Sequence, residues 1–260
     1  MNTLSIKEKA LSKTFVLIHG TWHGGWAWQE VVQCISRKGH SAHAPTLAGH
    51  GPGAARLGIR HQDCVASVVN YIRERRLSNI VLVGHSFGGT VAQKVAEEAL
   101  DRIARVVFLN ALILKDKECV FDVLPEVFLE ALKPKRNGDA AEMTSNEAMQ
   151  VLAPAPWETW RDNFIHDAAE SIARSTWERL SAEPNQVNLD RLDLKQFYSS
   201  AIPKSFIFCR HDRAMPPGYF HPGMSSRLGP HKLVEMDGSH EVMFTRPAEL
   251  ADKIFEASAD

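Results

Sequence analysis

The stretch Asn79–Ala92 reads NIVLVGHSFGGTVA and contains the pentapeptide Gly84-His85-Ser86-Phe87-Gly88. A short apolar run rich in β-branched residues precedes the pentapeptide and a helical pattern follows it, so the pentapeptide lies at a strand-to-helix turn. This is the context of a nucleophile elbow, in which flanking glycines permit a tight, strained turn that exposes the serine hydroxyl. The alternative is a glycine-rich loop without chemistry. The pattern favours Ser86 as a catalytic nucleophile.

The composition excludes several classes of protein. The chain has 260 residues, of which 44% are hydrophobic and 23% charged, as is ordinary for a globular protein. The net charge of −1 offers no field for nucleic acid or an anionic membrane, so we expect neither partner. The N-terminus has no apolar signal core and the cysteines form no close pair, which favours reduced thiols and a cytoplasmic location. The cysteines are Cys34, Cys64, Cys119 and Cys209.

Strand and helix patterns alternate along most of the chain. Strand-like runs cover residues 14–19, 41–44, 79–83, 103–109, 205–209 and 232–236, and helical patterns cover 26–38, 59–76, 90–96 onward and 247–257. Such alternation with short glycine-bounded connections predicts an α/β fold, a mostly parallel doubly wound sheet of about six strands. Residues 1–110 and 201–260 would form this core. Residues 111–200 show no strand-like run and are predicted to be several helices separated by prolines.

A serine nucleophile needs a base, and the base needs an orienting carboxylate. In a parallel sheet these groups gather beyond the carboxyl ends of the strands. Asp212 follows one strand there and His240 follows the last one, and the order Ser, Asp, His suits this architecture. The competing position for the acid, after the strand 103–109, holds Asn110, which is no carboxylate, and Asp116 comes several residues later. We therefore predict a triad of Ser86, His240 and Asp212.

The other histidines fit structural roles better. His19, His23 and His85 are predicted to order loops near the site, and the remainder lie at helix ends, in loops or away from this edge of the sheet. A metal site formed by His40, His43 and His50 is disfavoured, because it would require close packing of a flexible loop with no nearby carboxylate. We expect neither a metal nor a cofactor.

An oxyanion hole completes the predicted site. One donor would be the backbone N–H of Phe87, and the other an N–H of the glycine-rich turn after the first strand, Thr21 first and Trp22 second. Two such donors stabilise the tetrahedral oxyanion of acyl transfer.

With these pieces in place, the chain resembles the α/β-hydrolase superfamily, and within it the plant methyl esterases and hydroxynitrile lyases with their bacterial esterase relatives. The matching segments are FVLIHGTWHGGWAW (15–28), GHSFGG (84–89) and GSHEVMFTRPAEL (238–250). The resemblance implies that residues 111–200 form a helical cap that covers the serine and supplies an apolar pocket. It also implies a sheet without the first strands of longer relatives.

Two positions separate this chain from the lyases of that group. The lyases have a threonine where this chain has Gly20, and a lysine after the catalytic histidine where this chain has Glu241. The lysine stabilises a departing cyanide anion, and a carboxylate would oppose it. Lyase activity is therefore disfavoured. Glu241 itself has two interpretations, a carboxylate of a surface turn or a pocket residue.

The sequence favours a serine hydrolase acting on a carboxylic ester or lactone of a small to medium hydrophobic or aromatic molecule. The alternatives are a carbon–carbon bond hydrolase, a cofactor-free oxygenase or lyase, a transacylase, and a small-molecule receptor without turnover. We expect a small-molecule substrate and a monomer or homodimer. Candidate substrate contacts, mostly aromatic residues of the inserted segment, are Trp22, His85, Phe121, Phe128, Trp157, Trp160 and His166, with Phe164 and Trp177 as further pocket candidates.

Overall fold

The computed structural model describes residues 12–126 and 151–259. Its main sheet has six strands in the order β2-β1-β3-β4-β7-β8, and every neighbouring pair is parallel. The strands are β1 (Thr14–Ile18), β2 (Ser41–His43), β3 (Ile80–His85), β4 (Ile103–Leu109), β7 (Lys204–Cys209) and β8 (Lys232–Met236). The prediction of a mostly parallel sheet of about six strands is confirmed.

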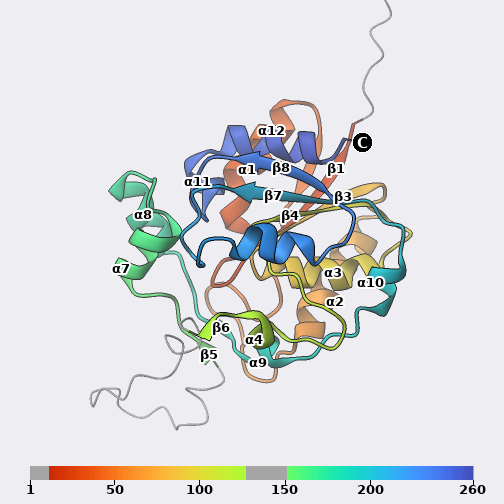
Figure 1. Cartoon of the computed structure of the whole chain (residues 1–260), viewed down its shortest axis with the longest axis horizontal. Helices are drawn as coiled ribbons and strands as arrows, with labels where there is room; N and C mark the ends of the chain where they lie inside the picture. The colour runs from red at the N-terminus through yellow and green to blue at the C-terminus, as the bar shows by residue number, and fades with distance from the viewer. Residues whose placement is uncertain (1–11, 127–150, 260) are drawn as a thin grey trace, which may run out of the picture.

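Helices cover both faces of this sheet (Figure 1). One face is covered by α1 (Gln29–Arg37), α11 (Val242–Thr245) and α12 (Pro247–Ala257), and the short 3₁₀ turn η1 (Gly25–Trp28) precedes α1. The other face is covered by α2 (His61–Glu74) and α3 (Gly88–Glu98). Successive strand residues point to opposite faces. In β3, Val81 and Val83 therefore pack in the α1 and α12 layer, while Ile80 and Leu82 pack in the α2 and α3 layer. Strands buried on both faces explain the continuous apolar runs.

The chain between β4 and β7 contributes no strand to the main sheet within the described residues. Its elements are α4 (Val120–Val123), β5 (Val151–Leu152), α7 (Trp157–Thr159), η2 (Trp160–Phe164), α8 (Glu170–Trp177), β6 (Glu183–Pro184), α9 (Gln186–Leu189) and α10 (Lys195–Ser199). The prediction that this segment contains no strand was wrong, because β5 and β6 pair as an antiparallel ribbon. Each has only two residues, which is too few for a periodic pattern.

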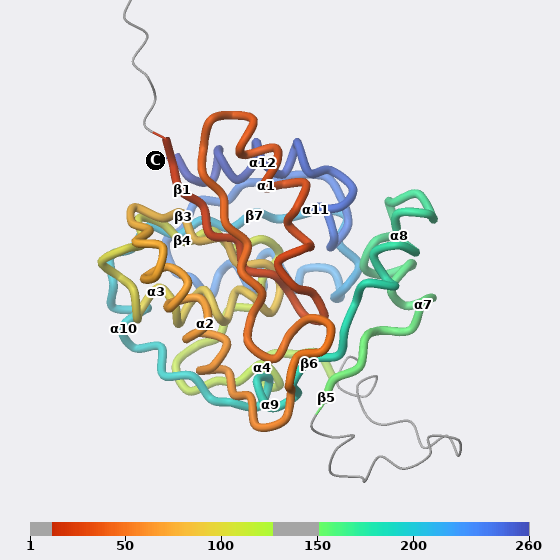
Figure 2. Tube along the Cα trace, turned by 180° about the vertical axis from the view of Figure 1, so that it is seen from behind, coloured from red at the N-terminus to blue at the C-terminus, as the bar shows by residue number. Residues whose placement is uncertain are grey.

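These elements lie around the carboxyl-end region of the core. Seen from both sides, α7 and α8 lie together beside the sheet, and β5, β6, α4 and α9 lie together below α2 (Figure 1, Figure 2). Between β7 and β8 the chain forms the short π-helical turn η3 (Tyr219–Met224). Among the described residues, no helix combines the length and apolar composition that crossing a bilayer requires. The four cysteines form no disulfide with one another.

Candidate active site

Ser86 lies at the turn between β3 and α3 with a backbone φ of 51°. This left-handed conformation is uncommon for a residue with a side chain and is held by its surroundings. The N–H of Ser86 donates to the carbonyl of Leu109 at 3.2 Å, and the Ser86 carbonyl accepts from Gly89 and Leu112, both at 3.0 Å. The strained turn is thus fixed by hydrogen bonds on both sides of the serine.

The glycines on either side of Ser86 have no room for a side chain. A Cβ added to Gly84 would lie 2.6 Å from the carbonyl oxygen of Gly88, and one added to Gly88 would lie 2.5 Å from that of His19. Both contacts are with backbone, which cannot move aside cheaply. The strand, the turn and the helix can pack this closely only without those side chains.

Gly88→Ala is expected to lower the free energy of unfolding by about 1–3 kcal/mol or more, because the new methyl group meets backbone. The matched control is Gly39→Ala, whose Cβ would meet no atom within 4 Å, so that the cost comes only from its φ of 83°. Urea unfolding of both variants measures the difference. Equal losses in the two variants would contradict the tight packing of the turn.

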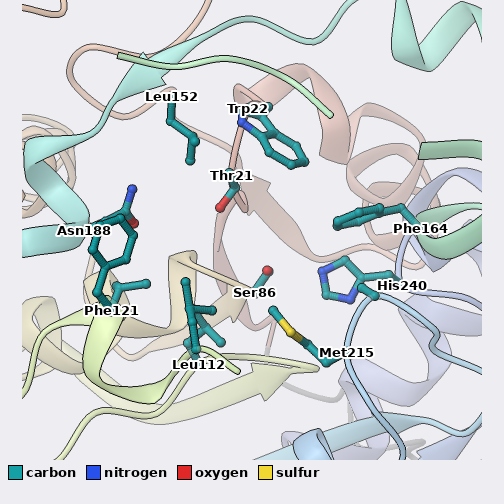
Figure 3. A pocket seen from close by; sticks show the side chains of 13 residues that line it. Thr21, Trp22, Ser86, Leu112, Phe121, Leu152, Phe164, Asn188, Met215 and His240 are labelled. Atoms are coloured by element: carbon teal, nitrogen blue, oxygen red, sulfur yellow. The ribbon is translucent and has the colours of Figure 1, made fainter. Parts of the chain in front are cut away.

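Asp212 and His240 are brought together from the loops after β7 and β8. His240 Nδ1 lies 2.5 Å from Asp212 Oδ2, and both side chains are buried. Because a carboxylate accepts, Nδ1 carries the proton and Nε2 keeps a lone pair. Figure 3 shows the imidazole of His240 facing the hydroxyl of Ser86. The three predicted triad residues therefore meet at one edge of the sheet.

Asn110 has a role that sequence reasoning missed. Its Nδ2 donates to Asp212 Oδ2, and its Oδ1 accepts the N–H of Cys209 at 2.9 Å. The backbone N–H of Ala214 donates to the other carboxylate oxygen at 2.8 Å. The residue considered only as a competitor for the acid therefore orients it. Asp116 instead accepts the N–H of Leu194, outside this network.

The surroundings of His240 act on its pKa in opposite directions. Burial lowers the pKa, while the charge of Asp212, its hydrogen bond and the charge of Glu241 raise it, and the result lies above the ordinary value of 6.5. The Asp212 carboxylate thus makes the imidazole a stronger base than a free histidine.

The turn after β1 carries the predicted oxyanion donors. Thr21 borders the same cavity as Ser86. Within residues 12–126 and 151–259, no hydrogen-bond acceptor is found for the N–H of Thr21 or of Phe87, so both remain available to a substrate. The N–H of Trp22, our second choice, is instead bound to Glu183 Oε2 at 2.8 Å. That hydrogen bond removes Trp22 as a donor.

Glu183, on β6, ties the inserted segment to this turn. Besides the N–H of Trp22, its Oε2 lies 3.2 Å from His50 Nε2, and neither of the two side chains is exposed. His50 Nδ1 donates to the carbonyl of Ala48 at 2.9 Å. Trp22 has a φ of 66°, so the carboxylate holds a strained residue next to Thr21. No sequence motif predicted this contact.

Glu183→Ala is expected to destabilise the protein by about 3–5 kcal/mol, because it leaves the buried Nε2 of His50 and the buried N–H of Trp22 without a partner. Glu183→Gln keeps an acceptor for Trp22 and should lose less. Urea unfolding compares the two variants, with kcat on an ester as a second measurement. Alanine and glutamine variants as stable as the parent would show that Glu183 does not hold the turn.

A pocket with about 480 Å³ of empty space, part of it open to solvent, lies over Ser86 and His240 (Figure 3). Nine of its thirteen lining residues are apolar, so a substrate that fills it buries mainly apolar surface. Thr21, Trp22, Phe121, Phe164, Ser86 and His240 were named from the sequence, whereas the following were not: Leu112, Val120, Leu124, Leu152, Asn188, Ala214 and Met215. These come from loops and short helices whose inward faces have no periodic signature.

Several aromatic candidates lie elsewhere. Trp160 is fully buried, stacks on Phe164 and donates its Nε1 hydrogen to the carbonyl of Ala173, so it supports the wall and does not form it. Trp157 packs against Trp177 and the Arg174 guanidinium. His166 does not border the cavity either. Phe128 lies outside the described residues.

His85 and Glu241 border a second, smaller cavity of about 190 Å³, which also reaches Ser86 and His240. Glu241 is only 2% exposed, so its interpretation as a surface-turn carboxylate was wrong. The turn after His240 folds inward, and the N–H of Glu241 donates to the carbonyl of Phe164 at 3.2 Å. Burial raises the pKa of Glu241 to about 8.

The profile of the alpha/beta hydrolase family matches residues 15–253. The chain belongs to this family.

Three similar proteins span nearly the whole chain. A carbendazim-hydrolyzing esterase of Nocardioides sp. is 25% identical over 92% of this chain and 97% of its own length. Methylesterase 7 of Arabidopsis thaliana is 25% identical over 96% and 97%. An extracellular alpha/beta-hydrolase from a Paenibacillus species, described as sharing structural and functional homology with tobacco salicylic acid binding protein 2, is 33% identical with a TM-score of 0.87, covering 95% of this chain and all of that one.

Proposed function

We propose that the chain hydrolyses a carboxylic ester or lactone of a small to medium hydrophobic or aromatic molecule through an acyl-enzyme. The observation that carries the proposal is the Asp212–His240 hydrogen bond, with the free imidazole nitrogen facing the strained Ser86. The coarser class is established by kinship with proteins named esterase, hydrolase and methylesterase: the chain is a carboxylesterase-type hydrolase.

In the proposed reaction, His240 Nε2 takes the Ser86 proton as Oγ attacks the carbonyl carbon. The N–H groups of Thr21 and Phe87 bind the oxyanion of the tetrahedral intermediate; one such donor typically contributes about 3 kcal/mol. When the C–O bond breaks, His240 returns the proton to the leaving alkoxide oxygen. Water, deprotonated by the same imidazole, then attacks the acyl carbon, and His240 passes that proton to Ser86 Oγ as the ester bond to the serine breaks.

The cavity supports an apolar acyl group. The side chains of Leu112, Phe121 and Phe164 contribute to its wall, while Asn188 is a polar residue beyond the reacting centre (Figure 3). At Glu241 the chain lacks the lysine that stabilises a leaving cyanide anion in the lyases, as inferred from the sequence. In this proposal residues 111–200 act as a cap, and the partner is a small molecule.

A substrate series tests the proposal. We expect p-nitrophenyl acetate and butyrate, and methyl esters of aromatic acids, to be hydrolysed to acid and alcohol, with kcat/KM falling for acyl groups that carry a charge. Chromatography of the products separates ester cleavage from carbon–carbon cleavage. A purified, folded protein that cleaves none of these esters, or that splits a ketone substrate preferentially, would contradict the proposal.

The activity should rise with pH through a pKa above 6.5. His240 must be neutral to accept the Ser86 proton, and Asp212 holds its pKa above the ordinary value, so the low-pH form is inactive. His23 and His85 also face this region, but burial lowers the pKa of both, and they stay neutral throughout the rise. Glu241, whose pKa is about 8, is the remaining group that faces this region and titrates within the measured range. A kcat/KM profile between pH 5 and 9 measures this; a rise centred well below 6.5 would contradict it.

A further inference from the structure

The smaller cavity beside Ser86 contains polar atoms that form no hydrogen bond. His85 Nε2 is buried and has no hydrogen-bond partner among the described residues. His23 Nε2 and Glu241 Oε2 form no hydrogen bond either, and they lie 3.5 Å from each other. Each of these residues is 2% exposed and borders the cavity. Because buried polar atoms are nearly always satisfied, the unpartnered His85 Nε2 beside the long His23–Glu241 contact indicates a bound species.

The hydrogen bonds on the other ring nitrogens define what the cavity offers. His85 Nδ1 lies 3.0 Å from the carbonyl of Leu109, and His23 Nδ1 lies 2.7 Å from that of Thr21. A carbonyl only accepts, so both Nδ1 atoms carry hydrogen and both Nε2 atoms present lone pairs. The Nε2 atom of His240 is left in the same state by Asp212. The cavity is therefore lined by electron-pair donors.

The positions of these donors suit one metal ion. One ligand atom each from His85, His240 and Glu241 lie within 4.8 Å of one another, and the two imidazole centroids are 4.6 Å apart. Two imidazole nitrogens and one carboxylate oxygen form a donor set that zinc uses with its fourth position open. Zinc–ligand bonds of about 2.1 Å allow ligand atoms of one ion to be at most about 4 Å apart. The described atoms are therefore close to, but slightly wider than, the spacing around one ion, so binding requires a small adjustment of the ligands.

The hydrogen bonds that the two histidines form through their other ring nitrogens also match a metal site. Ligating histidines usually donate their other ring hydrogen to a carboxylate or a backbone carbonyl, which fixes the tautomer and the ring orientation. Asp212 does this for His240, and the carbonyl of Leu109 does it for His85. Two of the three ligands are thus held in a coordinating orientation before any ion arrives.

We propose that His85, His240 and Glu241 bind Zn²⁺ and that the bound ion reversibly switches off hydrolysis. The ion accepts the lone pair of His240 Nε2, so the imidazole can no longer take the Ser86 proton. Zinc binding is independent of the proposed function, whereas the inhibition rests on it.

Binding is measured first, on the full chain freed of metals by a chelator. Isothermal titration with ZnCl₂ should give one ion per chain, and Co²⁺ should give the visible absorption of a low-coordinate site. Mg²⁺, which prefers six oxygen ligands, should not compete. Glu241→Gln and His85→Gln should each weaken Zn²⁺ binding at least about tenfold. The matched controls are Glu235→Gln and His231→Gln, whose side chains lie outside the cavity.

Inhibition is measured on the same preparations with p-nitrophenyl acetate. Ester hydrolysis should fall as Zn²⁺ fills the site and return with EDTA. No Zn²⁺ binding to the parent chain, or equal binding to the cavity variants and the controls, would overturn the metal site. The cavity would then hold only water and a proton. Binding without inhibition would overturn the switch. The parent chain alone shows whether Zn²⁺ binds, so a variant that fails to fold does not remove the test. A chain that binds Zn²⁺ but hydrolyses no ester refutes only the proposed function and the switch.

Discussion

Ser86→Ala is expected to lower kcat for ester hydrolysis about a millionfold, the size of loss seen when a serine nucleophile is removed from a triad. The alanine variant keeps the cavity and the turn but has no oxygen that can form the acyl-enzyme. The remaining rate would come from the oxyanion donors, which still polarise a bound carbonyl. KM should change little, since the apolar wall stays intact.

Steady-state hydrolysis of p-nitrophenyl butyrate by the parent and the alanine variant measures this effect. Ser226→Ala is the matched control, because this serine is exposed and donates only to the carbonyl of Gly223. The control should retain the parent rate. A Ser86→Ala variant with more than a few per cent of the parent kcat would show that the chemistry takes place elsewhere.

Asp212→Asn is expected to lower kcat about ten-thousandfold, by analogy with the same change in other serine triads. An asparagine amide facing His240 Nδ1 donates a hydrogen bond, so the ring would carry its own hydrogen on Nε2. In that tautomer the imidazole has no lone pair for Ser86. The Asn110 amide, which also points at this position, has lost its acceptor as well.

The same assay at pH 8, with circular dichroism to verify folding, measures the effect of Asp212→Asn. The control is Asp237→Asn, an exposed carboxylate paired with Arg210, which should keep the parent rate. The pKa of the rise in kcat/KM should also move downward in Asp212→Asn, since the largest contribution that raises the pKa of His240 is gone. A loss of less than tenfold with an unchanged profile would contradict the role of Asp212.

The core of the fold and the placement of the triad could be predicted because parallel strands leave a strong signal. The run at 103–109 was predicted from its buried-strand pattern, which is apolar except for Arg105, and β4 has these bounds. Once the strands are known to be parallel, the loops that follow them must meet at one edge, which brings Asp212 and His240 together without any knowledge of side-chain packing.

The cavity wall could not be predicted in the same way. Residues 111–200 have no repeating pattern that tells which face of a short helix points inward, so Phe164 and Trp160 could not be distinguished from the sequence. The contact of Glu183 with Trp22 joins residues 161 positions apart through one hydrogen bond. Glu241 follows a loop histidine, and only the inward fold of that turn decides whether it is buried.

Labelling with a fluorophosphonate tests the central claim most directly, because this reagent reacts with a serine oxygen only where a base and an oxyanion hole activate it. Intact-mass and peptide measurements should find one adduct per chain, on the peptide that contains Ser86, absent in Ser86→Ala and formed far more slowly in Asp212→Asn. An adduct on another residue, no adduct on Ser86, or undiminished ester hydrolysis by protein that is fully labelled at Ser86 would contradict the account.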